Sequence, residues 1–205
     1  MADRRQATPT RSELLGLRDE RQLIREGYQF LDEKRIILAH EVLRQLSTYT
    51  DVRSRYRSLH AEAVAQLAAA TARHGLEGLA VYPPRQALPG GPDHRIRRFL
   101  GLDILEFEGL AAEAPDRPDA PAFPSPEAER CAVSFAQLTG LAAELALLYA
   151  NLLRLIAEYR RTERRARALE NVLLPEIDAS IHFMEEQLEA IDQEEALRVR
   201  FAHPH

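Results

Sequence analysis

Tryptophan is absent from this sequence of 205 residues, lysine occurs once (Lys34) and cysteine occurs once (Cys131). A lone cysteine excludes an intrachain disulfide, and a reducing cytosol is the expected compartment. Aromatic residues make up only 6 %, and alanine, leucine, arginine and glutamate dominate, a composition that favours long helices over a packed globular core. The net charge of −5 disfavours a general polyanion binder.

The first fifteen residues, MADRRQATPTRSELL, contain no apolar core of the kind a signal peptide has. The most apolar stretch, residues 141–159, includes Glu144, Asn151, Arg154 and Glu158. Each charge at the centre of a bilayer costs about 2.5–3.5 kcal/mol on insertion scales. We therefore expect no direct membrane insertion and a cytoplasmic location.

Motifs of independent catalysis are also missing. The sequence has no GxxxxGK[ST] loop, no HExxH and no CxxC pair. His182 with Glu185 and Glu186 comes nearest to a helical metal site, but a di-metal bundle needs matching sites on several helices, so a solvated helix face is the expected role. The prediction is a protein with no catalytic residues, no metal and no cofactor of its own.

Proline and glycine divide the chain. Nine of the twelve prolines lie within residues 83–126, and six of the nine glycines lie within residues 75–109. Both flanking regions are almost free of helix breakers, which predicts two long helices around an irregular middle. The expected boundaries are a flexible N-terminal tail (1–9), an N-terminal coiled-coil helix (10–74), a middle segment (75–126), a C-terminal coiled-coil helix (127–200) and a tail (201–205).

Within the middle segment, GLAVY (78–82) and LDILEFEG (102–109) are candidate strands of a β-hairpin. The stretch 115–126 has the composition of a loop or linker. Ser125 or Glu127 is the expected start of the second helix, with Pro126 in its first turn.

The N-terminal helix carries a heptad. Alternate steps of three and four from Leu14 to Ala70 give seventeen positions, of which thirteen are apolar or tyrosine. A repeat of 3.5 residues over this length predicts a coiled-coil seam. The seam residues on which the prediction mainly rests are Leu14, Leu17, Ile24, Tyr28, Leu31, Leu38 and Val42.

The same alternation continues in the C-terminal helix from Leu138. Its principal seam residues are Leu145, Leu148, Leu152, Leu155, Leu169 and Leu173. Beyond Leu169 the pattern takes consecutive steps of four to Ile181 and resumes through Met184, Leu188 and Ile191, which is a stutter that relaxes the supercoil. Pro175 lies inside the stutter and should bend the helix.

Two seams of similar length joined by one middle segment can cover each other if the chain folds back on itself. The predicted fold is all-α dominated: a long antiparallel two-helix coiled coil with a short irregular or β-hairpin middle segment. At about 1.5 Å per residue, each helix of 60-odd residues would make a rod of roughly 90–100 Å. Parallel homodimerisation through each helix is the alternative.

Charged residues also occupy the N-terminal seam. Arg21 and Arg35 need partners there or a route to solvent. In the antiparallel arrangement, Glu163 and Glu170 of the C-terminal helix lie at about the position along the coiled coil from which they could pair with Arg35.

Arginines cluster in residues 160–167 of the C-terminal helix. Arg160, Arg164 and Arg167 fall at outward heptad positions, with Arg161 beside them and Arg165 at the flank. We refer to these five residues as the arginine cluster. It is either a solvated face with intrahelical partners such as Glu163, or a surface that meets an acidic or carbonyl-rich partner. Nucleic acid fits less well, because no aromatic residues interleave and acidic residues interrupt the patch.

Two motifs resemble those of the D subunit of V-type and archaeal-type (V/A) rotary ATPases. The first is Pro9-Thr10-Arg11 followed by spaced leucines, Gly27-Tyr28, Leu31 and Lys34-Arg35. The second is an arginine-rich turn, Ala168-Leu169-Glu170, an aliphatic run and Pro175. The chain departs from the family pattern at Arg167, where asparagine is usual, and at Asn171, where an aromatic residue or histidine is common. The resemblance covers both long helices.

The resemblance implies a non-catalytic central shaft whose termini enter a ring of alternating A and B subunits. It also implies contact with the small F subunit of the stalk and with a socket subunit on the membrane ring, and coupling of ATP hydrolysis or synthesis to ion transport. The predicted partner-interface residues are Arg11 and the arginine cluster, and no nucleic-acid partner is expected. Two alternatives remain at this point: a coiled-coil scaffold unrelated to ATPases, and a nucleic-acid-binding coiled coil whose affinity falls steeply with salt.

Overall fold

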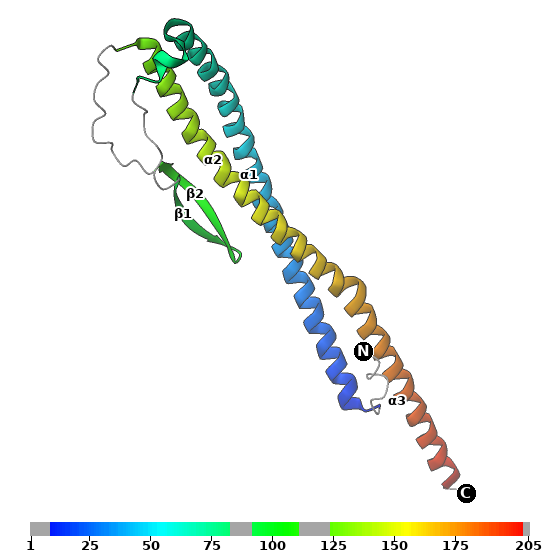
Figure 1. Cartoon of the computed structure of the whole chain (residues 1–205). Helices are drawn as coiled ribbons and strands as arrows, with labels where there is room; N and C mark the ends of the chain where they lie inside the picture. Colours follow the sequence, from blue (N-terminus) through cyan, green and yellow to red (C-terminus); the bar gives the residue numbers. More distant parts are fainter. Residues whose placement is uncertain (1–8, 83–91, 111–123, 203–205) are drawn as a thin grey trace. The chain divides into compact units, whose positions relative to one another are not determined.

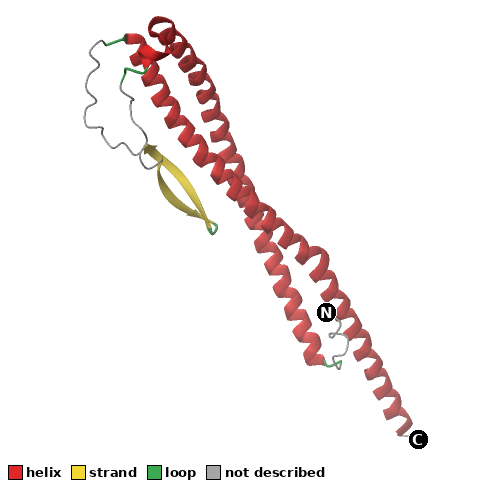
Figure 2. Cartoon of the chain, in the orientation of Figure 1, coloured by secondary structure: helices red, strands yellow, loops and turns green. Residues whose placement is uncertain are grey.

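The computed structural model describes residues 9–82, 92–110 and 124–202. Helix α1 (Arg11–Leu79) is followed by a hairpin of β1 (Pro92–Phe99) and β2 (Leu102–Leu110) (Figure 1). A second helical segment then comprises α2 (Pro126–Ala168), a π-helical turn η2 (Leu169–Leu173) and α3 (Leu174–Ala202). Figure 2 shows that helices account for most of the described chain. The predicted fold class, two long helices around a β-hairpin, is confirmed.

Some predicted boundaries fall on residues that the structure does not describe. Most of the predicted N-terminal tail (1–9) and most of the predicted linker (115–126) lie outside the described residues. The C-terminal tail was predicted to begin at residue 201, but α3 continues to Ala202, and residues 203–205 lie outside the described part.

The chain divides into two compact units. Unit 1 consists of Met1–Leu38 and Glu158–His205, so it combines the first and last segments of the sequence. Unit 2 is the continuous segment Ala39–Ala157, which includes the hairpin. Each unit pairs a part of α1 with a part of the C-terminal helical segment.

Helix α1 begins at a side-chain cap. Thr10 Oγ1 accepts a hydrogen bond from the backbone N–H of Glu13 at 3.2 Å, which satisfies one of the free donors of the first turn. Ser125 serves α2 in the same way, because its Oγ accepts from the N–H of Ala128 at 3.4 Å. Pro126 is the first residue of α2, where its missing N–H costs no hydrogen bond.

In unit 1, four ion pairs join α1 to the C-terminal helical segment. In each pair the basic residue lies on α1 and the acidic residue on the other helix, and the partner number falls as the α1 number rises, so the two helices are antiparallel. The pairs are Arg11–Asp192 (3.1 Å), Arg18–Glu185 (2.7 Å), Arg21–Asp178 (2.7 Å) and Lys34–Glu158 (2.7 Å).

Burial follows the heptad on both helices. Every predicted seam position of α1 from Leu14 to Ala70 is buried or half-buried, and so is every predicted position from Leu138 to Leu188. Leu38 and Leu155 have no exposed surface. Ile191 was also predicted to lie in the seam, but it is 47 % exposed. The reason is that the neighbouring Asp192 pairs with Arg11, the first residue of α1, so no further turn of α1 faces α3 beyond this point.

The predicted stutter coincides with the π-helical turn η2. The N–H of Leu174 bonds to the carbonyl of Leu169, five residues earlier, so this turn holds one residue more than an α-helical turn. Pro175 directly follows, and a proline has no N–H to complete an α-helical bond. The wide turn therefore takes up the extra residue of the stutter next to Pro175, and Ile177 and Ile181 beyond it are buried.

The first predicted strand of the middle segment is wrong. Residues 78–82 contain the end of α1 and a turn, with the N–H of Ala80 bonding to the carbonyl of Leu76. The strand that pairs with β2 is Pro92–Phe99, in antiparallel register with Arg97 opposite Ile104 and Phe99 opposite Leu102. The second predicted strand (102–109) matches β2. Charged residues make up half of β1, so its sequence lacks the apolar alternation that identifies a strand.

A two-residue turn, Leu100–Gly101, closes the hairpin. Both residues have positive φ (49° and 86°), which is the backbone of a type I′ turn and matches the twist of paired strands. Glycine adopts this conformation freely, whereas it is uncommon for leucine.

Within the described residues, the helical stretch Pro126–Phe201 holds a window of mean hydropathy 1.6 that is apolar and long enough to cross a membrane by length and composition alone. A helix that packs on other helices passes the same test. In this chain 17 % of that window is buried, and Leu147, Leu152 and Leu155 are among the buried residues of α2.

Candidate subunit interface

The arginine cluster lies on the exposed surface of α2. All five guanidinium groups belong to residues that are exposed to solvent. Arg161 Nη1 lies 3.6 Å from Glu158 Oε2, and Arg167 Nη2 lies 2.6 Å from Glu163 Oε1. Within the described residues, Arg160, Arg164 and Arg165 have no ion-pair partner. Arg167 is therefore paired within the helix, Arg161 shares the carboxylate of Glu158 with Lys34, and the other three exposed arginines are uncompensated in the described part of the chain.

Arg11, the remaining predicted interface residue, lies elsewhere. Its guanidinium pairs with Asp192 near the start of α1, although its side chain is 81 % exposed. Its partner Asp192 belongs to α3, whereas the arginine cluster belongs to α2. The structure therefore does not bring Arg11 together with the arginine cluster.

The pairing proposed for Arg35 is wrong. Arg35 pairs with Asp32 of its own helix at 2.5 Å, while Glu163 pairs with Arg167. Glu170 instead lies beside Tyr28, where its negative charge raises the pKa of the tyrosine hydroxyl. Arg35 binds the carboxylate that lies three residues before it on its own helix, and not one on the facing helix.

His182 pairs with Glu186 of its own helix at 3.2 Å, and its side chain is 75 % exposed. Glu185 is engaged by Arg18 of α1. Of the three side chains identified as the nearest approach to a metal site, His182 and Glu186 thus pair with each other, whereas Glu185 pairs with Arg18.

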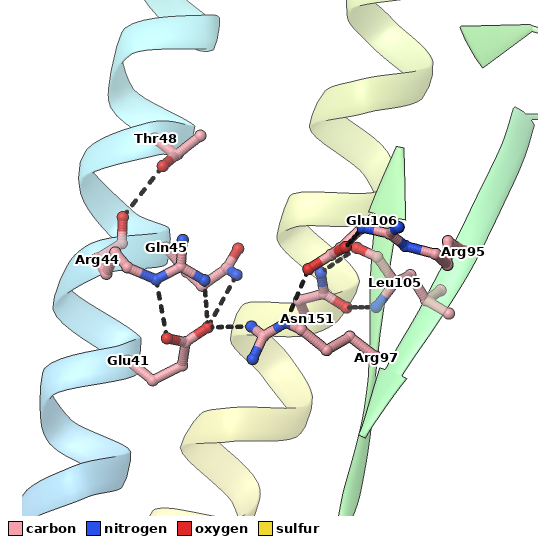
Figure 3. A network of polar contacts seen from close by, with 9 residues as sticks. All are labelled: Glu41, Arg44, Gln45, Thr48, Arg95, Arg97, Leu105, Glu106 and Asn151. Carbon is pink, nitrogen blue, oxygen red and sulfur yellow. Dashed lines mark hydrogen bonds and ion pairs between the residues drawn. The ribbon is translucent and has the colours of Figure 1, made fainter. Parts of the chain in front are cut away.

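A polar network that the sequence did not reveal holds the hairpin to α1 in unit 2 (Figure 3). Arg97 of β1 is its centre: Nη2 donates to Glu41 Oε1 of α1 at 2.9 Å, and Nε donates to Glu106 Oε1 of β2 at 2.7 Å. Arg95 Nη2 reaches the other oxygen of Glu106 at 2.7 Å. We call Glu41, Arg97 and Glu106 the hairpin network.

Glu41 is buried, with 8 % of its surface exposed, yet it remains ionised. Arg44 donates to both of its carboxylate oxygens at 2.6 and 2.9 Å, and Gln45 and Arg97 donate further hydrogen bonds. The hydrogen bonds from Arg44 make the largest contribution. Together these donors lower the pKa of Glu41 to about 2, although burial alone would raise it.

On the α2 side, the hairpin is held by the main chain of β2. The side-chain amide of Asn151 donates to the carbonyl of Leu105 at 2.7 Å and accepts from its N–H at 2.9 Å. Arg154 donates to the carbonyl of Asp103 at 3.3 Å, and a side chain added at Gly140 would meet Leu110 at 3.8 Å. Strand β2 therefore runs antiparallel beside α2, from Gly140 to Arg154.

The hairpin network positions the hairpin against α1. Its side chains are charge-paired, and within the described residues no nucleophile lies beside a general base among them. The sequence did not predict these contacts of the hairpin. Neither the charged residues of β1 nor the single asparagine in an apolar helical stretch belongs to a periodic pattern that would indicate their partners. The one available signal was Asn151 itself, a polar residue inside the most apolar stretch.

Comparison with known proteins gives a consistent picture. The sequence model of the family described as the D subunit of ATP synthase matches residues 13–203. The chain belongs to this family. The match includes both long helices, the hairpin and the arginine cluster.

Curated relatives match over almost their whole length. The chain is 28 % identical to the D subunit of the A-type ATP synthase of Thermococcus gammatolerans, over 98 % of this chain and 94 % of the relative. It is 29 % identical to that of Methanoregula boonei, over 96 % and 95 %. It is 23 % identical to the D subunit of the V-type ATP synthase of Thermotoga neapolitana, over 94 % of each. The resemblance found in the two sequence motifs is confirmed, and neither the scaffold nor the nucleic-acid alternative finds support.

Proposed function

We propose that this chain is the central shaft of an A/V-type rotary ATP synthase, and that it carries rotation rather than catalysis. In this role it couples ATP hydrolysis or synthesis in one part of the complex to ion transport in another. The observation that carries the proposal is the antiparallel pairing of the first and last segments in unit 1, in a member of the D-subunit family. A shaft requires a stiff element that its partners can turn.

The proposed partners follow from this role. Unit 1, with both chain ends, would enter a ring of alternating A and B subunits that carries the nucleotide sites. Unit 2, with the hairpin, would face the small F subunit of the stalk and a socket subunit of the membrane ring. The protein would be cytoplasmic and peripheral to the membrane, without inserting into it.

The mechanical step rests on asymmetry. As the shaft turns, different faces meet a given ring subunit, and a contact can bias that subunit between open and closed states only by binding one state better. Uncompensated surface charges suit this task, because they are released into water with little loss when the shaft turns onward. Arg160, Arg164 and Arg165 are exposed charges of this kind.

The proposal is tested by reconstitution. Purified chain is mixed with the A and B subunits of the same organism, with and without the F subunit, and the mass of the eluted complex is measured by size-exclusion chromatography with light scattering. We expect one copy of the chain in each six-membered ring, with an altered ATPase rate. Elution of the chain alone, or several copies for each ring, would contradict the shaft proposal and favour a scaffold.

A further inference from the structure

Helix α1 has a second apolar row that its coiled coil does not use. Leu23, Phe30 and Ile37 are 69 %, 66 % and 45 % exposed, although all three are large apolar residues in unit 1. They are spaced by seven residues, so they share one face of the helix. None belongs to the seam. We call these three residues the outer apolar row.

Acidic side chains flank the outer apolar row. Asp19, Glu26 and Glu33 each precede one member of the row by four residues and therefore lie next to it on the helix surface. Glu26 accepts a hydrogen bond from Gln22 at 2.9 Å. In the part of the chain that the structure describes, Asp19 and Glu33 have no ion-pair partner.

From this arrangement we infer that the outer apolar row is a docking site for a helix of a partner subunit, with apolar residues at seven-residue spacing and lysine or arginine beside them. The inference rests on the proposed function, since it names the chemistry of one partner contact of the shaft. It differs from the predicted interface, because it places an apolar contact on α1 beside the contacts predicted for the arginine cluster.

The spacing favours a helix as the partner. Side chains seven residues apart on α1 are separated by about 10.5 Å, and a helix packed alongside presents its own side chains with the same repeat. A β-strand repeats each face at roughly 6.6–6.8 Å, so its side chains would fall out of step with the row.

The charges favour a basic flank on that helix. Three carboxylates in a row next to an apolar surface repel an acidic partner and attract a basic one. Lys34 lies on the other side of the row but is engaged by Glu158 at 2.7 Å, so it does not offset the acidic flank.

Photo-crosslinking in the assembled complex tests the site. A benzophenone amino acid replaces Phe30 in the full chain, which is then reconstituted with purified A, B and F subunits, irradiated and digested for mass spectrometry. The same group at Leu76, 74 % exposed in unit 2, is the matched position. We expect Phe30 to give a crosslink to a partner helix of the stated chemistry, and Leu76 to give a different product or none.

The outcomes separate this inference from the proposed function. A crosslink within the chain, to a second copy of it, or to a partner segment of different chemistry would overturn the inference. So would the absence of a crosslink in a complex that contains the chain. If the chain does not enter the complex at all, the proposed function fails and the inference fails with it.

A triple variant measures the strength of the contact. Leu23→Gln, Phe30→Gln and Ile37→Gln keep good helix formers at exposed positions, so folding should be preserved and can be checked by circular dichroism. We expect the variant to bind the partner subunits at least about tenfold more weakly. Val64→Gln, Leu67→Gln and Leu76→Gln on the same helix in unit 2 are the control, and an equal effect in both variants would overturn the inference.

Discussion

The side-chain amide of Asn151 pairs with both main-chain groups of Leu105, at 2.7 and 2.9 Å, as a neighbouring strand would. Asn151 is 1 % exposed, in the middle of an apolar helix. A helix side chain thus provides the hydrogen bonds that one edge of β2 would otherwise lack at this residue.

Replacing Asn151 should release the hairpin. Asn151→Ala removes two hydrogen bonds to half-buried main-chain groups of Leu105, so we expect a loss of about 1–3 kcal/mol in the free energy of unfolding. Hydrogen exchange at residues 102–110 should speed up in the same variant. Asn171→Ala, at the chain's other asparagine, which is exposed, is the control. Unchanged exchange in Asn151→Ala would show that the pairing does not hold β2.

The stability of unit 2 should depend on pH through Glu41. The pKa of this carboxyl is about 2 in the folded protein, against an ordinary value of 4.5. Since the folded pKa is the lower one, the stabilisation is complete above about pH 4.5 and is lost as the pH falls towards 2. The full difference corresponds to roughly 3 kcal/mol.

The variant Glu41→Gln tests this dependence. It should be less stable than the natural chain at pH 7 by roughly the same 3 kcal/mol and should lose less stability between pH 4.5 and 2. Denaturant unfolding at several pH values measures both effects. Glu62→Gln, at an exposed glutamate of the same helix and unit, should change neither. Parallel pH curves for the natural chain and Glu41→Gln would contradict the role of Glu41.

The cross-helix ion pairs of unit 1 should differ in strength according to burial. The side chains of Lys34 and Glu158 are 19 % and 13 % exposed, whereas those of Arg11 and Asp192 are 81 % and 54 % exposed. Water screens an exposed pair, so we expect a coupling energy above about 1 kcal/mol for Lys34–Glu158 and below about 0.5 kcal/mol for Arg11–Asp192. Double-mutant cycles with alanine measure both, and equal couplings would be the contrary result.

The arginine cluster should act mainly through its uncompensated members. In the reconstituted complex, replacement of all five arginines by glutamine should uncouple ATP hydrolysis from ion pumping or weaken assembly. The partial variant Arg160→Gln, Arg164→Gln, Arg165→Gln should retain most of that defect, whereas Arg161→Gln with Arg167→Gln should have little. The ratio of ions pumped to ATP hydrolysed is the measurement. If ATP hydrolysis and ion pumping stayed fully coupled in the variant with all five replacements, the arginine cluster would be only a solvated face of the helix.

The sequence predicted the helices well because their cause is local and repetitive. The heptad from Leu14 to Ala70 identifies which side of α1 is covered, and the structure buries or half-buries each of those positions. The stutter around Leu173 likewise marked the place of the π-helical turn. In both cases a periodic pattern carries the information redundantly, so single polar residues such as Gln45 do not hide it.

The hairpin and its attachment were harder to predict because they depend on single long-range contacts. Strand β1 was missed since its charged residues satisfy Glu41 and Glu106 instead of forming an apolar face. Arg35 was assigned the wrong partner because the position of a residue along a helix does not determine which of several nearby carboxylates its flexible side chain binds. The outer apolar row was overlooked because a search for one seam treats every other apolar position as incidental.

The central claim, that the chain turns inside a ring, is tested most directly by observing rotation. In a chain with Cys131→Ser, the exposed Arg98 of the hairpin is replaced by cysteine (Arg98→Cys) and coupled to a gold particle, while A and B subunits are fixed to a surface. On addition of ATP we predict stepwise rotation of the particle in one direction. A stationary or randomly moving particle on rings that contain the chain and hydrolyse ATP would contradict the account.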